Sequence, residues 1–321
     1  MAAPLQIPSN PLGAGGPRVA RVALGCGNFG GVGSAPAFFG QGLSHAAALE
    51  LMDAAWALGI RHFDTADAYG GGRSEEAIGA WIRSRRTRPS LTTKTFNRMS
   101  AEGDQGLAPD RIRRQFASSL ERLGVDRVDL YLAHDFDRSV ALADTLATFE
   151  ELREAGQVVS YGVSNFNAMQ FQQALDIGGI SAVQNGYSLL QRDDEADVLG
   201  LCARSGIGYI VYSPLCGGWL TGKYRRGSAY PFGSRMTQRP EPYEALATDA
   251  TFDRLEWLEG FSAERGSSMA GTALAWLLAD ERITQVVIGP GRPDHLEPVR
   301  EAIERPLSAD ERQLVSEYFS G

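Results

Sequence analysis

The sequence predicts one α/β domain, a closed (β/α)8 barrel of parallel strands. Two observations predict it. Short β-rich runs alternate with amphipathic helical runs along the chain, and such alternation produces parallel strands joined by right-handed crossovers. Eight strand candidates fit into 321 residues, and barrels of this kind form a single domain at a length that would otherwise suggest two.

Each strand candidate is a short run rich in β-branched and aromatic residues. After the first of them, the Gly-rich sequence GCGNFGG does not lead directly into a helix, as it would in an open dinucleotide-binding sheet. The closed barrel is therefore favoured over its structural rival, the open doubly wound sheet. The eight candidates are 21–27, 60–66, 90–94, 128–134, 158–164, 181–186, 208–214 and 284–290.

The run between the first two strands, 45–58, shows the helical period most clearly. Its apolar residues from Ala48 to Trp56 recur at the i, i+3, i+4, i+7, i+8 spacing that places them on one face. In the last helical run, Ser308 stands where a helix N-cap is expected, with Glu311 three residues later. The other helical runs are 73–86, 109–123, 141–154, 167–176, 193–205, 252–265, 268–279, 294–303 and 308–319.

Two segments fall outside this alternation. Residues 1–17 are rich in Pro and Gly, so we expect a flexible arm there and a barrel over 18–321. The stretch 216–248 is too long for a passive connector, so we expect it to be functional or mobile. The N-terminus has neither a basic nor an apolar region of the kind that secretory signals carry, so we expect none.

Composition narrows the class of protein. Lys and Arg number 31 against 39 Asp and Glu, a net charge of −8, so we expect no nucleic-acid and no membrane partner. The three cysteines, Cys26, Cys202 and Cys216, lack the spacing of metal ligands. We therefore expect no metal site, no disulfide framework and a reducing, cytoplasmic location. The oligomeric state does not follow from the sequence.

Four polar residues follow three successive strand candidates. Asp64 ends the second strand with Tyr69 in the next loop, Lys94 ends the third strand, and His134 ends the fourth. Each type, taken alone, is more often a cap, a packing residue or a surface group. Because a barrel carries its chemistry at the carboxyl ends of its strands, we expect these four side chains to converge on one side of the mouth.

These residue types together form a device for acid catalysis. A tyrosine hydroxyl has an ordinary pKa near 10, and an ammonium at ~4 Å lowers it by roughly 3 units. We therefore expect Lys94 to bring the pKa of Tyr69 close to neutral, where general acid catalysis is most efficient. Asp64 would keep Lys94 charged, and His134 would donate a second hydrogen bond to a substrate carbonyl.

Seven motifs in order make the chain resemble the aldo-keto reductase superfamily, in a bacterial branch related to sugar and aldehyde reductases and to potassium-channel β subunits. The resemblance implies a nicotinamide cofactor at the barrel mouth and Tyr69 as the proton donor. The motifs are HFDTADAYGGGRSEE (62–76), TTK (92–94), VDLYLAH (128–134), YGVSNF (161–166), VQNGYSLL (183–190), YSPLCGGWLTGKY (212–224) and VVIGPG followed by Arg292 (286–292).

The same resemblance implies a cofactor groove. It assigns the nicotinamide end to Asn28, Phe29, Asp64, Ser164, Asn165, Gln184 and Tyr212. It assigns the phosphates to Ser213, Leu215, Gly217, Lys223 and Arg235. It assigns the adenine end to Gly291, Arg292 and His295.

The adenine end departs from the family pattern. His295 takes the usual place of Arg or Gln, and Pro298 and Val299 replace the common Glu-Asn pair. Arg292 is available to a 2′-phosphate, slightly out of the usual place. The resemblance therefore implies that NADP(H) is preferred and that NAD(H) is possible.

We expect a small-molecule carbonyl or alcohol as substrate, interconverted by hydride transfer. Two alternatives stay open: a cofactor-binding regulatory subunit with little or no activity, and a barrel lyase or isomerase without a redox cofactor. Nothing in the sequence separates sugar, aromatic and steroid-like carbonyls. The expected pocket residues are Phe29, Phe38, Phe39, Tyr69, His134 and Trp219.

Overall fold

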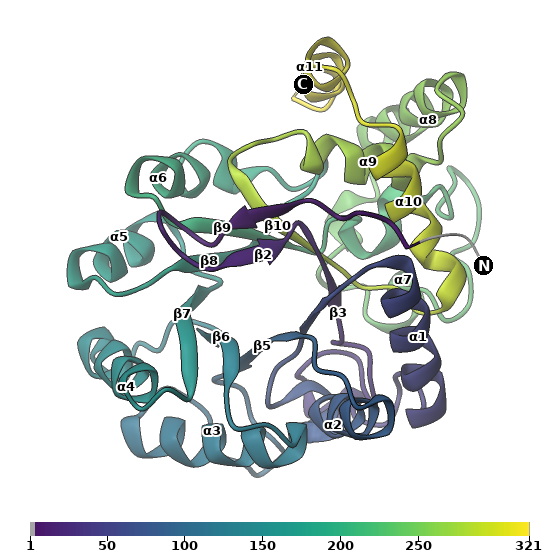
Figure 1. The fold of residues 1–321 in the computed structure, drawn as a ribbon. Helices are drawn as coiled ribbons and strands as arrows, with labels where there is room; N and C mark the ends of the chain where they lie inside the picture. The colour runs from purple at the N-terminus through teal and green to yellow at the C-terminus, as the bar shows by residue number, and fades with distance from the viewer. Residues whose placement is uncertain (1–3, 321) are drawn as a thin grey trace.

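The computed structural model describes residues 4–320, and in it eight parallel strands close into a barrel (Figure 1). The predicted barrel is confirmed, and every predicted strand is present. In order around the barrel the strands are β10 (Ile283–Ile288), β3 (Val22–Gly25), β4 (His62–Asp64), β5 (Ser90–Thr95), β6 (Val128–Ala133), β7 (Val158–Ser164), β8 (Ala182–Gly186) and β9 (Gly208–Tyr212). Five strands are shorter than predicted, whereas β5 ends one residue later, β7 has the predicted bounds and β10 begins one residue earlier.

Helices cover the outside of the barrel, one after each strand. These outer helices are α1 (His45–Leu58), α2 (Arg73–Arg85), α3 (Pro109–Leu123), α4 (Leu142–Glu154), α5 (Ala168–Ile177), α6 (Val198–Ser205), α9 (Met269–Leu278) and α10 (Glu297–Glu304). The described chain also contains α7 (Arg235–Gln238), α8 (Asp249–Glu264) and α11 (Ala309–Tyr318). None of its helices is both long enough and apolar enough to cross a bilayer.

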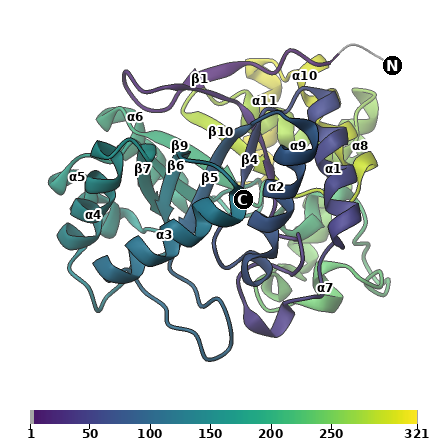
Figure 2. The ribbon, with the colours of Figure 1, turned by 60° about the horizontal axis from the view of Figure 1, so that its bottom comes forward.

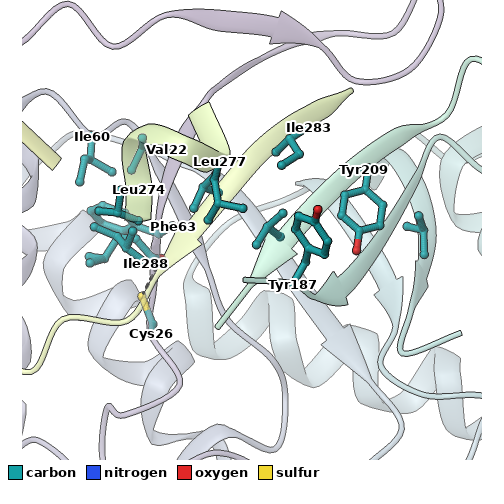
Figure 3. Packing of buried hydrophobic residues seen from close by; sticks show 14 of the residues in the cluster. Val22, Cys26, Ile60, Phe63, Tyr187, Tyr209, Leu274, Leu277, Ile283 and Ile288 are labelled. Carbon is teal, nitrogen blue, oxygen red and sulfur yellow. Dashed lines mark hydrogen bonds between the residues drawn. The ribbon is translucent and has the colours of Figure 1, made fainter. Parts of the chain in front are cut away.

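The strands bury side chains on both faces, as parallel strands in such folds do. Ala23, Leu130 and Ile210 belong to a small cluster inside the barrel, whereas Leu24 belongs to the larger cluster between strands and helices. Figure 3 shows part of the larger cluster, in which Leu274 of α9 lies near Ile288 of β10 and Phe63 of β4. This double core holds the strand ends, and thus the site, in place.

Local signals set several helix ends as expected. The Ser308 hydroxyl accepts from the Glu311 backbone amide, and the Glu311 carboxylate accepts in return, which makes the N-cap of α11 a capping box. The predicted helix 193–205 is wrong as one element, since a short 3-10 turn, η3 (Asp193–Glu195), precedes α6. The Asp194 carboxylate there accepts hydrogen bonds from Asn185 and Tyr209, which tie this turn to the barrel.

The expected flexible arm is wrong for residues 9–17, and residues 1–3 lie outside the described residues. A hairpin of β1 (Ser9–Pro11) and β2 (Arg18–Ala20) lies across the barrel end where the strands begin (Figure 1). Leu12 is 1% exposed and joins the cluster inside the barrel. The Pro- and Gly-rich segment therefore forms an ordered turn that closes this end of the barrel, because the burial of Leu12 stabilises the turn.

The long segment 216–248 contains three short helical pieces in place of irregular chain. They are η4 (Cys216–Thr221), α7 and η5 (Glu244–Leu246). Figure 2 shows α7 and the β1–β2 hairpin at opposite ends of the barrel. The segment thus lies at the mouth, where the strands end.

Candidate active site

A buried ion pair connects neighbouring strands at the barrel mouth. The Lys94 ammonium donates to Asp64 Oδ1 at 2.5 Å and to the Thr65 carbonyl oxygen at 2.9 Å. Gln184 Nε2 donates to Asp64 Oδ2 at 2.8 Å, so both carboxylate oxygens accept. Burial lowers the pKa of Lys94, but the Asp64 and Tyr69 charges outweigh it, and the net shift is upward. Lys94 is therefore charged at neutral pH.

Tyr69 stands directly over this ammonium. Its ring centroid lies 5.3 Å from Lys94 Nζ, and its ring edge lies 3.5 Å from where a Cβ on Gly27 would be. Tyr69 begins the 3-10 turn η2 (Tyr69–Gly72), in which Gly70 and Gly71 adopt positive φ angles of 61° and 69° that favour glycine. This turn carries the phenol back over the barrel mouth.

The expected near-neutral pKa of Tyr69 is wrong in this structure. Burial raises the pKa of Tyr69, and the Lys94 ammonium offsets only part of that rise. The desolvation of the phenolate thus outweighs the attraction of the neighbouring charge. Tyr69 is protonated at neutral pH, which is the form that a proton donor requires.

His134 completes the group of four. Its ring centroid lies 5.5 Å from that of Tyr69, with the rings 77° apart. Burial, and then the Lys94 charge, lower the pKa of His134 to about 3, so its ring is neutral. Asn97 Nδ2 lies 3.3 Å from His134 Nδ1. The sequence analysis did not identify Asn97 as a site residue. Only its position, three residues after Lys94, could have indicated it.

Residues expected at the nicotinamide end lie beside the four and touch them. Asn165 Nδ2 donates to the His134 carbonyl oxygen at 2.8 Å, and Tyr212 donates to Asn165 Oδ1 at 2.6 Å. The Ser164 hydroxyl donates to the Gln184 carbonyl oxygen at 2.7 Å. Asn165 has a φ of 61°, a conformation that non-glycine residues adopt mainly where the surroundings enforce it. One polar network thus joins both groups.

The residues expected at the phosphate end lie on an unusual turn after β9. Ser213 and Cys216 have positive φ angles of 54° and 48°, and Gly217 has one of 61°. Leu215 accepts from the Gly218 amide at 2.9 Å and so closes this turn. Such turns aim backbone amides into one concavity, which suits an anion.

Two cations flank this turn without an acidic partner. Among residues 4–320, neither Lys223 nor Arg235 forms a salt bridge, and no carboxylate is among the charges that shift the pKa of either. Burial lowers the pKa of both, and Arg235 lowers that of Lys223 further. Two neighbouring cations without a counter-ion fit a pyrophosphate.

The residues expected at the adenine end are more exposed to solvent. Arg292 forms an ion pair with Asp294 at 2.7 Å, with both side chains about two-thirds exposed. His295 Nδ1 accepts from the Gly291 amide at 3.2 Å. Asn28 Nδ2 donates to a backbone carbonyl of the same loop at 2.9 Å, whereas its buried Oδ1 has no partner among the described residues. That oxygen is an acceptor available to a bound group.

Two expected pocket residues do not line the mouth. Phe29 and Trp219 are fully buried in the larger core cluster. The Trp219 ring packs edge-on against Tyr224 and Tyr230, with centroids 5.0 and 6.3 Å away. The Phe29 and Trp219 rings both stand next to glycine-rich turns, and each fills the space beneath its turn in place of facing the mouth. Phe38 is half-buried, with the Arg239 guanidinium 5.6 Å from its ring centroid, and the Phe39 ring lies beside Gly71 of the turn that carries Tyr69.

The family model described as "Aldo/keto reductase family" matches residues 21–318. The chain belongs to the aldo/keto reductase family. This aldo/keto reductase is 32% identical to the uncharacterized oxidoreductase YrpG of Bacillus subtilis, over 97% of this chain and 95% of the relative. It is 30% identical to the NADH-specific methylglyoxal reductase of Escherichia coli, over 96% and 97%. The structure of the aldo-keto reductase AKR11C1 from Bacillus halodurans superposes with a TM-score of 0.79 at 26% identity, covering 98% of this chain and 96% of that one.

Proposed function

We propose that this aldo/keto reductase interconverts an aldehyde or ketone and its alcohol, with Tyr69 as the general acid. One observation carries the proposal: a protonated phenol lies over the buried Lys94 ammonium, which is itself held by Asp64. A solvated tyrosine would have no such partner for the charge it develops. Three free, buried cysteines fit the cytoplasm as the place of action.

Each of the four residues has a distinct task. The Tyr69 hydroxyl hydrogen-bonds the carbonyl oxygen of the substrate and transfers its proton to that oxygen as negative charge develops there. The Lys94 ammonium stabilises the resulting phenolate, and Asp64 keeps the ammonium in place. Neutral His134 donates a second hydrogen bond to the same oxygen. Preorganised donors of this kind act where charge develops in the transition state.

The residues present fit a nicotinamide dinucleotide, which when bound supplies or accepts the hydride. The free Oδ1 of Asn28 would accept a hydrogen bond from the bound dinucleotide, and the exposed Asn165 would meet polar groups near the ring. Lys223 and Arg235 would hold the phosphates. Arg292 would contact a 2′-phosphate, so NADP(H) is preferred and NAD(H) is accepted. The name of the methylglyoxal reductase relative shows that NADH use occurs at this level of similarity.

The test is NADPH oxidation at 340 nm with a panel of small aldehydes and ketones, for the wild type and for Tyr69→Phe. General acid catalysis is worth about 10²–10⁴-fold, so the variant should lose at least ~100-fold in kcat. NADP⁺ affinity, measured by titration calorimetry, should stay within about twofold, because Tyr69 does not hold the phosphates.

Other outcomes point elsewhere. Near-normal turnover by Tyr69→Phe would refute the assignment of Tyr69. Tight cofactor binding without turnover of any carbonyl would favour a regulatory subunit. Failure to bind either dinucleotide would favour a lyase or isomerase.

A further inference from the structure

We propose that Asn97 is a positioning residue that holds the neutral His134 ring in its Nε2–H tautomer and so aims a hydrogen-bond donor at the substrate carbonyl. The inference deepens the proposed function and rests on it. No part of the family resemblance assigns Asn97 a role. The contact between Asn97 and His134 carries the argument.

The contact points to the ring nitrogen that bears the proton. Asn97 Nδ2 lies 3.3 Å from His134 Nδ1, and an amide nitrogen only donates. Nδ1 must then accept, so in the neutral ring the proton is on Nε2. The hydrogen bond made by one ring nitrogen thus decides what the other offers to a ligand.

The His134 backbone is held as firmly as the ring. Its amide donates to the Thr95 carbonyl oxygen at 2.9 Å, and its carbonyl oxygen accepts from Asn165 Nδ2 at 2.8 Å. With the backbone fixed on both sides, ring orientation depends on the side-chain contacts. Tyr69 packs across the ring and Asn97 bonds its Nδ1.

Arg111 makes the loop that carries Asn97 rigid. This α3 residue is 4% exposed, and its guanidinium donates to the Asn97 carbonyl oxygen at 2.7 Å. It also donates to Thr95 Oγ1 and to the Gly106 carbonyl oxygen, each at 3.0 Å. Thr95 Oγ1 in turn donates to Asp67 Oδ2 at 2.7 Å. Asn97 is therefore presented from a buried frame that extends to the loop before Tyr69.

The choice of tautomer has a chemical consequence. A neutral ring with its proton on Nδ1 would turn the Nε2 lone pair toward the substrate oxygen, and two acceptors repel. Loss of one preorganised donor to a developing oxyanion costs about 10²–10³-fold in kcat. Asn97 would thus control kcat without touching substrate.

Asn97→Asp is the decisive variant, because it preserves shape but replaces the donating nitrogen with an accepting oxygen. Long-range ¹H–¹⁵N spectra of the full chain, labelled at its four histidines, distinguish the two tautomers. His134→Gln identifies the His134 signals. We expect Nε2–H in the wild type, an Nδ1–H ring in Asn97→Asp, and a fall in kcat of about 100-fold. Cofactor affinity should change by less than about twofold.

Two further variants keep the test sharp. Asn167→Asp makes the same chemical change at an exposed helix N-cap, where aspartate also caps, and should leave kcat and the spectrum unchanged. Asn97→Leu removes the donor without adding an acceptor, so it should lose less activity than Asn97→Asp. A merely structural role predicts the reverse order, since leucine alters the loop more than aspartate does.

Clear results would overturn the proposal. An Nδ1–H signal in the wild type, or an unchanged Nε2–H signal in Asn97→Asp, removes its basis. If the tautomer reverses in Asn97→Asp and kcat does not fall, the tautomer of His134 does not control turnover. A wild type that reduces no carbonyl would defeat the proposed function instead, and the spectra of the free protein would still report the tautomer.

Discussion

Lys94 is one of two lysines in a chain that otherwise uses arginine for positive charge. Its ammonium is fully buried between the Asp64 carboxylate and the Thr65 carbonyl oxygen. A planar guanidinium on a longer stem cannot place a point charge under Tyr69. We expect Lys94→Arg to lower kcat by at least ~100-fold while the protein remains folded by circular dichroism. Activity within a few-fold of the wild type would contradict this role.

The buried carboxyl of Asp67 predicts that the free energy of unfolding depends on pH. Burial raises the pKa of Asp67 to about 7, although the Thr95 hydrogen bond lowers it in part. The unfolded chain releases this proton near pH 4. Between about pH 4 and pH 7, Asp67 holds a proton in the folded chain that it has released in the unfolded chain. The contribution of Asp67 to the free energy of unfolding therefore falls as the pH rises from about 4 to about 7, and it stays constant above pH 7.

Asp67→Asn tests this directly, because the amide has nothing to ionise. Urea titrations at pH 4 and pH 8 measure the free energy of unfolding. Between these pH values it should fall less in the variant than in the wild type, and the difference between the two falls should be up to a few kcal/mol. Asp126→Asn, at an exposed carboxyl, is the matched control and should parallel the wild type. Parallel curves for Asp67→Asn would show that Asp67 ionises normally in the folded state.

At the scale of elements, the later part of the segment 216–248 packs over the turn that follows β9. The Tyr243 ring lies so close to Gly217 that a Cβ there would be 2.7 Å from it. Among the smaller effects on their pKa values, the Tyr243 hydroxyl raises the pKa of both Arg235 and Tyr212. We expect the segment to rearrange around a bound dinucleotide and to become ordered over it.

Limited proteolysis can follow that ordering, since Phe232 at the far end of the segment is fully exposed. Cleavage within 216–248 should slow several-fold when NADP⁺ is present at saturating concentration, because bound ligand suppresses opening. A site outside the segment should be cut at an unchanged rate and serves as the control. Equal rates within 216–248 would mean that the segment does not close on the cofactor.

At the scale of the molecule, a chain of net charge −8 must gather positive charge locally to hold a 2′-phosphate. Arg292 is the candidate, but its ion pair with Asp294 competes for the same guanidinium. A charge-assisted hydrogen bond contributes about 1.5–3 kcal/mol, which corresponds to roughly a 10- to 100-fold preference for NADP(H). This is a moderate preference, weaker than several cations would produce.

Two variants measured by titration calorimetry test that preference. Arg292→Ala should bind NADP⁺ and NAD⁺ almost equally, whereas Asp294→Asn should bind NADP⁺ more tightly because the competing carboxylate is gone. NAD⁺ affinity should change little in either variant. Equal affinity of the wild type for both dinucleotides would show that Arg292 is a solvated surface charge.

Much of the architecture and the centre of the site could be predicted from the sequence alone. The alternation of strand and helix patterns determines the barrel because it reflects local periodicity and short connections. The group Asp64, Tyr69, Lys94 and His134 follows from the same pattern, since the carboxyl ends of parallel barrel strands meet at one mouth. The structure brings these four together around one buried ion pair.

Other properties of the protein depend on burial and on the distances between separate elements, and only the tertiary structure decided these. The pKa of Tyr69 rises because desolvation outweighs the Lys94 charge, a balance that residue types do not contain. Trp219 belongs to the core, and Leu12 orders an N-terminus that composition predicts to be flexible. Asn97 meets His134 because Arg111, from helix α3, holds its loop. Sequence patterns encode local order, whereas desolvation and proton position arise only when distant segments pack together.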